Sequence, residues 1–70
     1  MKYSKGEIES YMQKIEQIRA DMKEGRHIIA CLGSVGLTFN DDIERFTKFV
    51  SHIDFDISEE IIKHCSFITI

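Results

Sequence analysis

The sequence predicts a mainly α fold, a single helical domain over residues 1–70 in which two long helices form an antiparallel hairpin and a short third helix follows. Three observations carry this prediction. Apolar residues recur every three or four positions in two separate segments, a glycine-rich stretch divides the segments, and the chain has four glycines and no proline. A repeat near 3.5 residues places the apolar side chains on one stripe of an α-helix.

The first segment begins at Ser4, and its stripe consists of Ile8, Tyr11, Ile15, Ile18 and Met22. Ser4 and Glu7 have the spacing of a capping box, in which each side chain accepts a backbone N–H of the other residue. Because the repeat continues through Gly25 to Leu32, we predict one helix from Ser4 to about Leu32. Alternatively, Gly25 ends this helix, and residues 26–32 form a strand.

Residues 33–36, Gly-Ser-Val-Gly, are expected to form the turn of the hairpin, with Gly33 just past the end of the first helix. The second stripe then consists of Phe39, Ile43, Phe46, Val50 and Ile53, and Phe49 widens it. Thr38 or Asn40 is the expected N-cap of this second helix.

Residues 54–56, Asp-Phe-Asp, favour helix formation poorly and are expected to end the second helix. Ser58 is then the expected N-cap of the short third helix, whose apolar side includes Ile61 and Cys65. Residues 66–70 alternate in the manner of a strand. The alternative fold is therefore a small α+β domain, in which 26–32 pairs with 37–40 and 66–70 adds a strand.

Seven aromatic side chains and two apolar stripes exceed the surface that one hairpin of two helices can bury. We therefore expect self-association into a helical bundle, as a homo-oligomer whose number of copies the stripes leave open.

Charge and hydropathy limit the function classes. Residues 1–36 hold six basic and five acidic groups, whereas residues 37–70 hold three basic and seven acidic groups. Because binding to a phosphate backbone needs clustered lysine and arginine, direct nucleic-acid binding is disfavoured. No apolar run reaches the roughly 20 residues that cross a bilayer, and the start of the chain lacks a secretory signal, so we expect a cytoplasmic protein without membrane contact.

Candidate chemistry is sparse. His27, Cys31, His64 and Cys65 could in principle bind zinc, but the tight C-x-x-C pairs of structural zinc sites are missing. Both cysteines lie among apolar residues and are expected to be buried, reduced thiols. A small helical hairpin seldom excludes water from a nucleophile, so we expect no enzymatic activity, no metal and no cofactor.

Two surfaces remain as candidate binding sites. The speculative ligand site consists of Arg26, His27, Gly33, Ser34 and Gly36, whose exposed backbone N–H groups and cationic side chains suit a small anion such as a nucleotide. The speculative partner surface consists of Phe49, Phe55, Asp41 and Asp42.

The leading hypothesis is a small non-enzymatic binding protein, an inhibitor, adaptor or regulator that occupies the surface of one partner protein. The second is a homo-oligomer that sequesters a small anionic ligand between subunits. The third is an acidic mimic of nucleic acid that blocks a DNA-binding protein.

Overall fold

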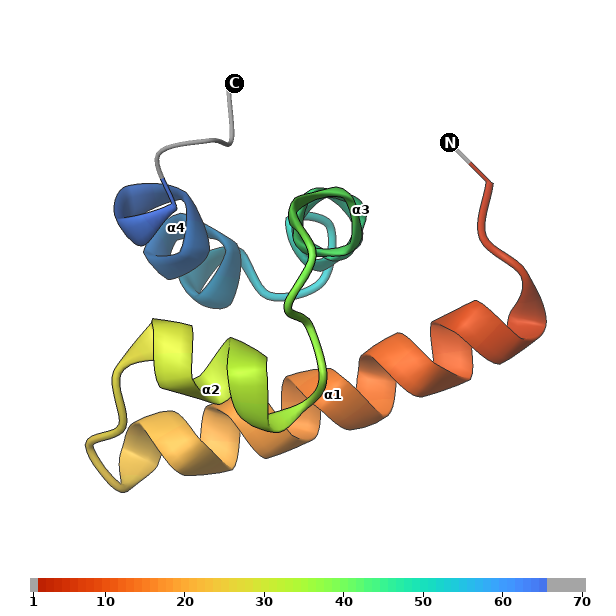
Figure 1. The fold of residues 1–70 in the computed structure, drawn as a ribbon. Helices are drawn as coiled ribbons and strands as arrows, with labels where there is room; N and C mark the ends of the chain where they lie inside the picture. Colours follow the sequence, from red (N-terminus) through yellow and green to blue (C-terminus); the bar gives the residue numbers. More distant parts are fainter. Residues whose placement is uncertain (1, 66–70) are drawn as a thin grey trace.

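The computed structural model describes residues 2–65, and these form four α-helices and no strand (Figure 1). The helices are α1 (Lys5–Lys23), α2 (Ile28–Ser34), α3 (Asn40–Val50) and α4 (Phe55–His64). The mainly α class is therefore confirmed. The α+β alternative is wrong for residues 26–40, which contain no strand, and the strand expected at 66–70 lies outside the described residues.

The start of α1 is as predicted. The Glu7 N–H donates to the Ser4 hydroxyl oxygen at 3.1 Å, and the Ser4 N–H donates to the Glu7 carboxylate at 3.1 Å. This capping box satisfies two backbone N–H groups that have no partner within the helix.

The single helix predicted from Ser4 to Leu32 is wrong, because the chain reverses at Gly25. This glycine has φ +88°, in the left-handed region, and its N–H donates to the Met22 carbonyl. The next N–H, of Arg26, donates to the Asp21 carbonyl. These two bonds form a Schellman motif, which ends α1 and lets a separate α2 begin.

A second Schellman motif ends α2, and it is built on Gly36 instead of the expected Gly33. Gly36 has φ +83°, its N–H donates to the Gly33 carbonyl, and the Leu37 N–H donates to the Leu32 carbonyl. Gly33 itself lies inside α2.

The second predicted helix also divides differently. The N-cap of α3 is Phe39, not Thr38 or Asn40, and α3 ends at Val50. Asp54 caps α4 by accepting the Ile57 N–H at 3.3 Å, so residues 54–56 begin a helix where the sequence predicted only an end. Ser58, the expected cap, is buried inside α4.

The helices form two packed pairs. In Figure 1, α2 runs back along the C-terminal half of α1, α3 crosses α1 and is seen end-on, and α4 lies over α2. All four helices contribute to one core, whose buried apolar residues are Ile15, Ile18, Ile28, Cys31, Leu32, Leu37, Ile43, Phe46, Phe49, Val50, Ile57, Ile61 and Cys65. A single chain thus supplies four helices to its own core. This removes the surface-area argument for self-association, which stays a prediction.

Two ionic contacts join α1 to the second pair. Arg19 pairs with Asp54 at the start of α4. Near the N-terminus, the Arg45 side chain of α3 donates to both carboxylate oxygens of Glu7, at 2.8 and 3.2 Å. Its guanidinium also lies 4.7 Å from the centre of the Tyr3 ring, within the range of a cation–π contact.

Alanine substitutions at Gly25 and Gly33 should change the free energy of unfolding in opposite directions. We expect Gly25→Ala to lower the free energy of unfolding by about 1 kcal/mol, because a Cβ is unfavourable in the left-handed region. Gly33→Ala should raise it by up to about 1 kcal/mol, because alanine favours the helix interior. A Cβ at either position meets no atom within 4 Å, so packing does not mask the comparison. Urea denaturation of both variants is the measurement, and stabilisation by Gly25→Ala would support a continuous helix instead.

Glu7→Gln should flatten the pH dependence of stability between pH 4.5 and 2. Hydrogen bonds from Arg45 lower the pKa of Glu7 from 4.5 to about 2. The unfolded chain binds a proton at Glu7 more tightly than the folded chain does. The Glu7–Arg45 pair therefore makes its full contribution to the free energy of unfolding above pH 4.5, and this contribution is lost as the pH falls towards 2. Denaturation at several pH values measures this, with Glu9→Gln on the same helix as the control. Parallel profiles for the wild type and Glu7→Gln would contradict the assignment.

Candidate functional site

The candidate site is a hollow that we name the α2–α4 groove. It encloses about 290 Å³ and is lined by Ile29, Leu32, Gly33, Leu37, Thr38, Asn40, Ile43 and Cys65. These residues come from α2, the α2–α3 connection, the start of α3 and the end of α4. Two other hollows lie at Asp41, Glu44, Arg45 and Lys48 and at Arg19, Met22, Lys23, Asp54, Asp56 and Ile57. Both are lined mainly by charged residues, whereas the α2–α4 groove has no charged residue in its lining.

The Schellman motif at Gly36 builds the floor of the groove. Its 6→1 hydrogen bond joins Leu37 to Leu32 at 3.0 Å, and both side chains are buried. A hydrophobic contact between these two positions commonly accompanies the motif. Ile29 lies one turn before Leu32 on the same face of α2. Gly33, whose missing side chain would meet no atom within 4 Å, leaves this part of the groove open.

Two large apolar side chains are exposed at this site. Ile29, in the groove wall, is 46% exposed, and Phe39, between the lining residues Thr38 and Asn40, is 71% exposed. Phe39 is exposed because it occupies the N-cap of α3, where the chain is extended and the side chain is not yet on the helix stripe. Ile29 therefore presents exposed apolar surface in the groove lining, and Phe39 presents it on the adjoining stretch of chain.

The first turn of α3 adds negative charge beside the groove. Asp41 and Asp42 follow Asn40 directly, both are exposed, and neither forms an ion pair with the other residues of 2–65. Carboxylates in the first helical turn are favoured by the helix dipole, so the charges are stable without a cationic partner.

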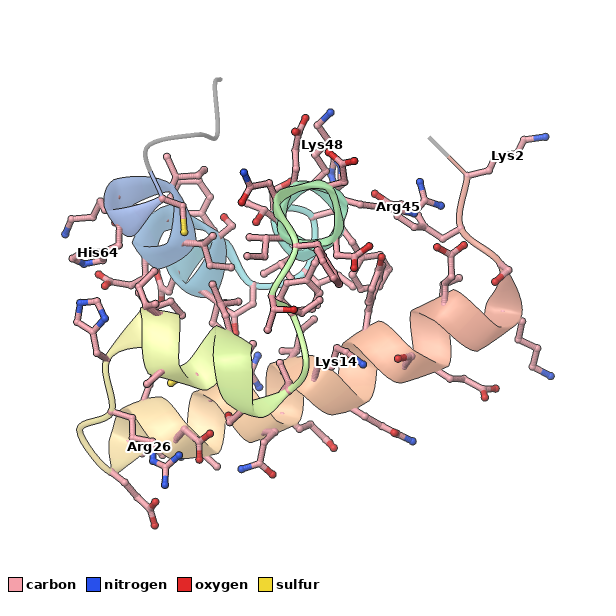
Figure 2. The ribbon with its side chains drawn as sticks, in the orientation of Figure 1. Lys2, Lys14, Arg26, Arg45, Lys48 and His64 are labelled. Carbon is pink, nitrogen blue, oxygen red and sulfur yellow. The ribbon has the colours of Figure 1, made fainter. Side chains whose placement is uncertain are left out.

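Two histidines that do not line the groove lie where α2 begins and α4 ends. The rings of His27 and His64 are 4.8 Å apart, centre to centre, in an edge-on contact. His27 caps α2, its Nδ1 accepting the Ile29 N–H at 3.2 Å, and His64 Nε2 is 3.5 Å from a carboxylate oxygen of Glu60. Figure 2 shows His64 at the end of α4 that faces α2. Within residues 2–65, no group of three or more histidine, cysteine or acidic side chains is arranged to hold a metal ion.

The two cysteines are free and buried, as predicted. Burial raises the pKa of both thiols. A protonated thiol is a weak nucleophile, so Cys65 contributes to the groove as an apolar wall.

The structure does not bring the five predicted ligand residues together. Arg26 and His27 lie at the start of α2, whereas Gly33, Ser34 and Gly36 lie at its end, roughly 10 Å away at 1.5 Å per residue. The Ser34 hydroxyl donates to the Cys31 carbonyl at 2.9 Å and also contacts the buried Asp21 carboxylate at 3.2 Å. An anion at Ser34 would meet this carboxylate and the helix carbonyls. Figure 2 shows Arg26 at the α1–α2 turn.

The predicted partner surface is also divided. Phe49 is buried, which corrects the prediction that it is exposed, because its ring packs against Tyr3 at 5.1 Å and Tyr11 at 5.2 Å. Phe55 is 66% exposed but begins α4, at the opposite end of that helix from Cys65. Asp41 and Asp42 lie near the groove.

The sequence did not indicate that Ile29 and Phe39 are exposed, because both fall on the predicted apolar stripes and were expected in the core. The signal that could have identified Phe39 is its place just before three polar residues, Asn40, Asp41 and Asp42, which together are typical of a helix start.

Comparisons with protein-family models, with curated proteins and with solved structures find no match to this chain. None of the helices within residues 2–65 combines the length and the apolar character needed to span a membrane.

Alanine substitutions should separate the buried phenylalanine from the exposed one. We expect Phe49→Ala to lower the free energy of unfolding by about 3 kcal/mol, because it leaves a cavity among aromatic rings. Phe55→Ala, at a side chain already 66% exposed, should change it by less than about 0.5 kcal/mol. Chemical denaturation of both variants is the measurement, and equal values for the two would contradict the assigned burial of Phe49.

Proposed function

We propose that this chain is a small binding protein and that the α2–α4 groove receives an apolar segment of a partner protein. The observation that carries the proposal is a hollow without a charged lining residue, in which the lining residue Ile29 is exposed and next to which, along the chain, Phe39 is exposed. Apolar surface that is exposed around a concavity is typical of a protein interaction site.

The charges beside the groove specify the partner further. Asp41 and Asp42 are free to pair with lysine or arginine on a partner, as argued from their exposure and lack of an ion pair within residues 2–65. The partner segment therefore carries an aromatic or aliphatic anchor followed or preceded by basic residues. Such charges raise the association rate and specificity more than the final affinity.

The two alternative functions have weaker support. For the anionic ligand, the Ser34 hydroxyl already contacts the Asp21 carboxylate. A mimic of nucleic acid requires an uninterrupted negative surface. Three acidic residues of the second half of the chain, however, form ion pairs with lysine or arginine. These pairs are Glu44 with Lys48, Asp54 with Arg19, and Glu60 with Lys63.

Selection from a phage-displayed random peptide library tests the proposal even though the natural partner is unidentified. We expect the selected peptides to share an apolar anchor and one or more lysines or arginines. Calorimetry with a synthetic copy of a selected peptide should show at least a ten-fold weaker affinity for Phe39→Ser, since truncating an aromatic anchor commonly costs more than about 1.4 kcal/mol.

Phe55→Ser is the matched control, because Phe55 is almost as exposed as Phe39 but lies at the far end of α4. Its affinity for the peptide should equal that of the wild type. Loss of binding by Phe55→Ser with none by Phe39→Ser would move the site to the surface that the sequence first suggested. Selected peptides without basic residues would contradict the assigned role of Asp41 and Asp42.

A further inference from the structure

We infer that a second copy of this chain docks on the hollow between α1 and α4, which we name the α1–α4 hollow, and that the two copies form a symmetric dimer. The hollow encloses about 310 Å³ and is lined by Arg19, Met22, Lys23, Asp54, Asp56 and Ile57. None of these residues lines the α2–α4 groove, so the inference does not rest on the proposed function.

The first argument is apolar surface on the stretch of chain that adjoins the hollow. Phe55, which lies between the lining residues Asp54 and Asp56 in the chain, is 66% exposed. Ile53, directly before Asp54, is 47% exposed. Contact with another protein would remove the apolar area of these two side chains from water.

The second argument is a pair of opposite charges without counter-ions. Arg19 of α1 pairs with Asp54 of α4, so these two charges of the hollow are already compensated. Lys23 and Asp56 line the same hollow, are exposed, and form no ion pair with any residue of 2–65. One cation and one anion therefore remain for a docking protein.

Charge complementarity selects a second copy as that protein. In a two-fold symmetric interface the same patch faces itself, so each contact between two different residues is made twice. Lys23 of each copy then lies against Asp56 of the other copy, and a single patch gains two ion pairs. Because both residues line one hollow, one axis that passes between them brings both pairs together.

The α2–α4 groove does not have this self-complementarity. The free charges near it, Asp41 and Asp42, are both acidic. A second copy docked symmetrically there would place like charges opposite each other, which opposes association. The two surfaces therefore suit different occupants, a basic segment of another protein at the groove and a second copy at the α1–α4 hollow.

The apolar and ionic contacts have different roles in the dimer. Aromatic and aliphatic side chains at the centre of an interface supply most of the affinity, whereas charge pairs fix the orientation of the copies. Each copy contributes only two large exposed apolar side chains, Ile53 and Phe55. We therefore expect an interface of the small class, below about 1,200 Å² in total, and a dimer that dissociates on dilution.

Sedimentation velocity with exchanged charges tests the pairing. Lys23→Glu and Asp56→Lys should each weaken self-association by at least about ten-fold, because like charges then face each other. An equimolar mixture of the two variants should form a heterodimer, because each variant supplies the charge that the other lacks. The double variant with both substitutions should dimerise on its own. Circular dichroism of each variant checks that the helices are intact.

Glu9→Lys is the matched control for net charge. It changes the charge of the chain by the same amount as Asp56→Lys, at an exposed position of α1 that does not line the hollow. Self-association should be as in the wild type. A wild type that stays monomeric at millimolar protein would overturn the inference. So would a mixture of Lys23→Glu and Asp56→Lys that fails to associate, or an equal loss of dimer in Glu9→Lys.

Phe55→Ser and Phe39→Ser separate the dimer from the proposed function. We expect Phe55→Ser to weaken self-association by at least about ten-fold, since loss of an aromatic side chain from an interface core commonly has this effect. Phe39→Ser should leave self-association unchanged. Dimerisation that depends on Phe39 and not on Phe55 would overturn the assigned surface, whereas peptide affinity insensitive to Phe39→Ser would contradict only the proposed function.

Discussion

The left-handed backbone at Gly25 is the constraint on which the arrangement of the helices depends. It lets the N–H groups of Gly25 and Arg26 donate to the carbonyls of Met22 and Asp21, so α1 ends and the chain turns back. The reversal places α2 along α1, where the buried Asp21 carboxylate accepts a hydrogen bond from Gln17 and contacts the Ser34 hydroxyl at 3.2 Å. Without that turn, Ile28, Cys31 and Leu32 would continue along one long helix and could not close the core from the other side.

Aromatic and ionic contacts hold the α3–α4 pair against the α1–α2 pair. Phe46 is fully buried, and its ring lies 5.3 Å from Tyr11 of α1. The ion pairs Arg45–Glu7 and Arg19–Asp54 lie at the edges of this interface and are partly exposed. Exposed ion pairs contribute little to stability on their own, so the apolar core supplies most of the cohesion and the pairs orient the helices.

The sequence was sufficient to predict local features whose cause is local. The capping box at Ser4 and the buried cysteines follow from residue type and neighbours. The periodicity also predicted a mainly α fold. It could not decide whether Gly25 lies in a helix or ends one, since the apolar spacing is the same in both cases and tertiary packing makes the difference. The exposure of Phe39 was missed for a related reason. An N-cap residue keeps its spacing in the apolar repeat, but its backbone is extended, so its side chain does not lie on the apolar face of the helix.

The groove is a consequence of the way α2 ends. Gly36 turns the chain so that the Leu37 N–H donates to the Leu32 carbonyl, and these two buried lining residues, joined through the backbone, give the groove a fixed floor. Two exposed apolar side chains accompany this floor: Ile29 belongs to the groove lining, and Phe39 lies between the lining residues Thr38 and Asn40 in the chain. A fixed apolar floor with adaptable exposed side chains suits short segments of differing sequence, because the floor sets the depth of the anchor and the exposed side chains adjust to its shape.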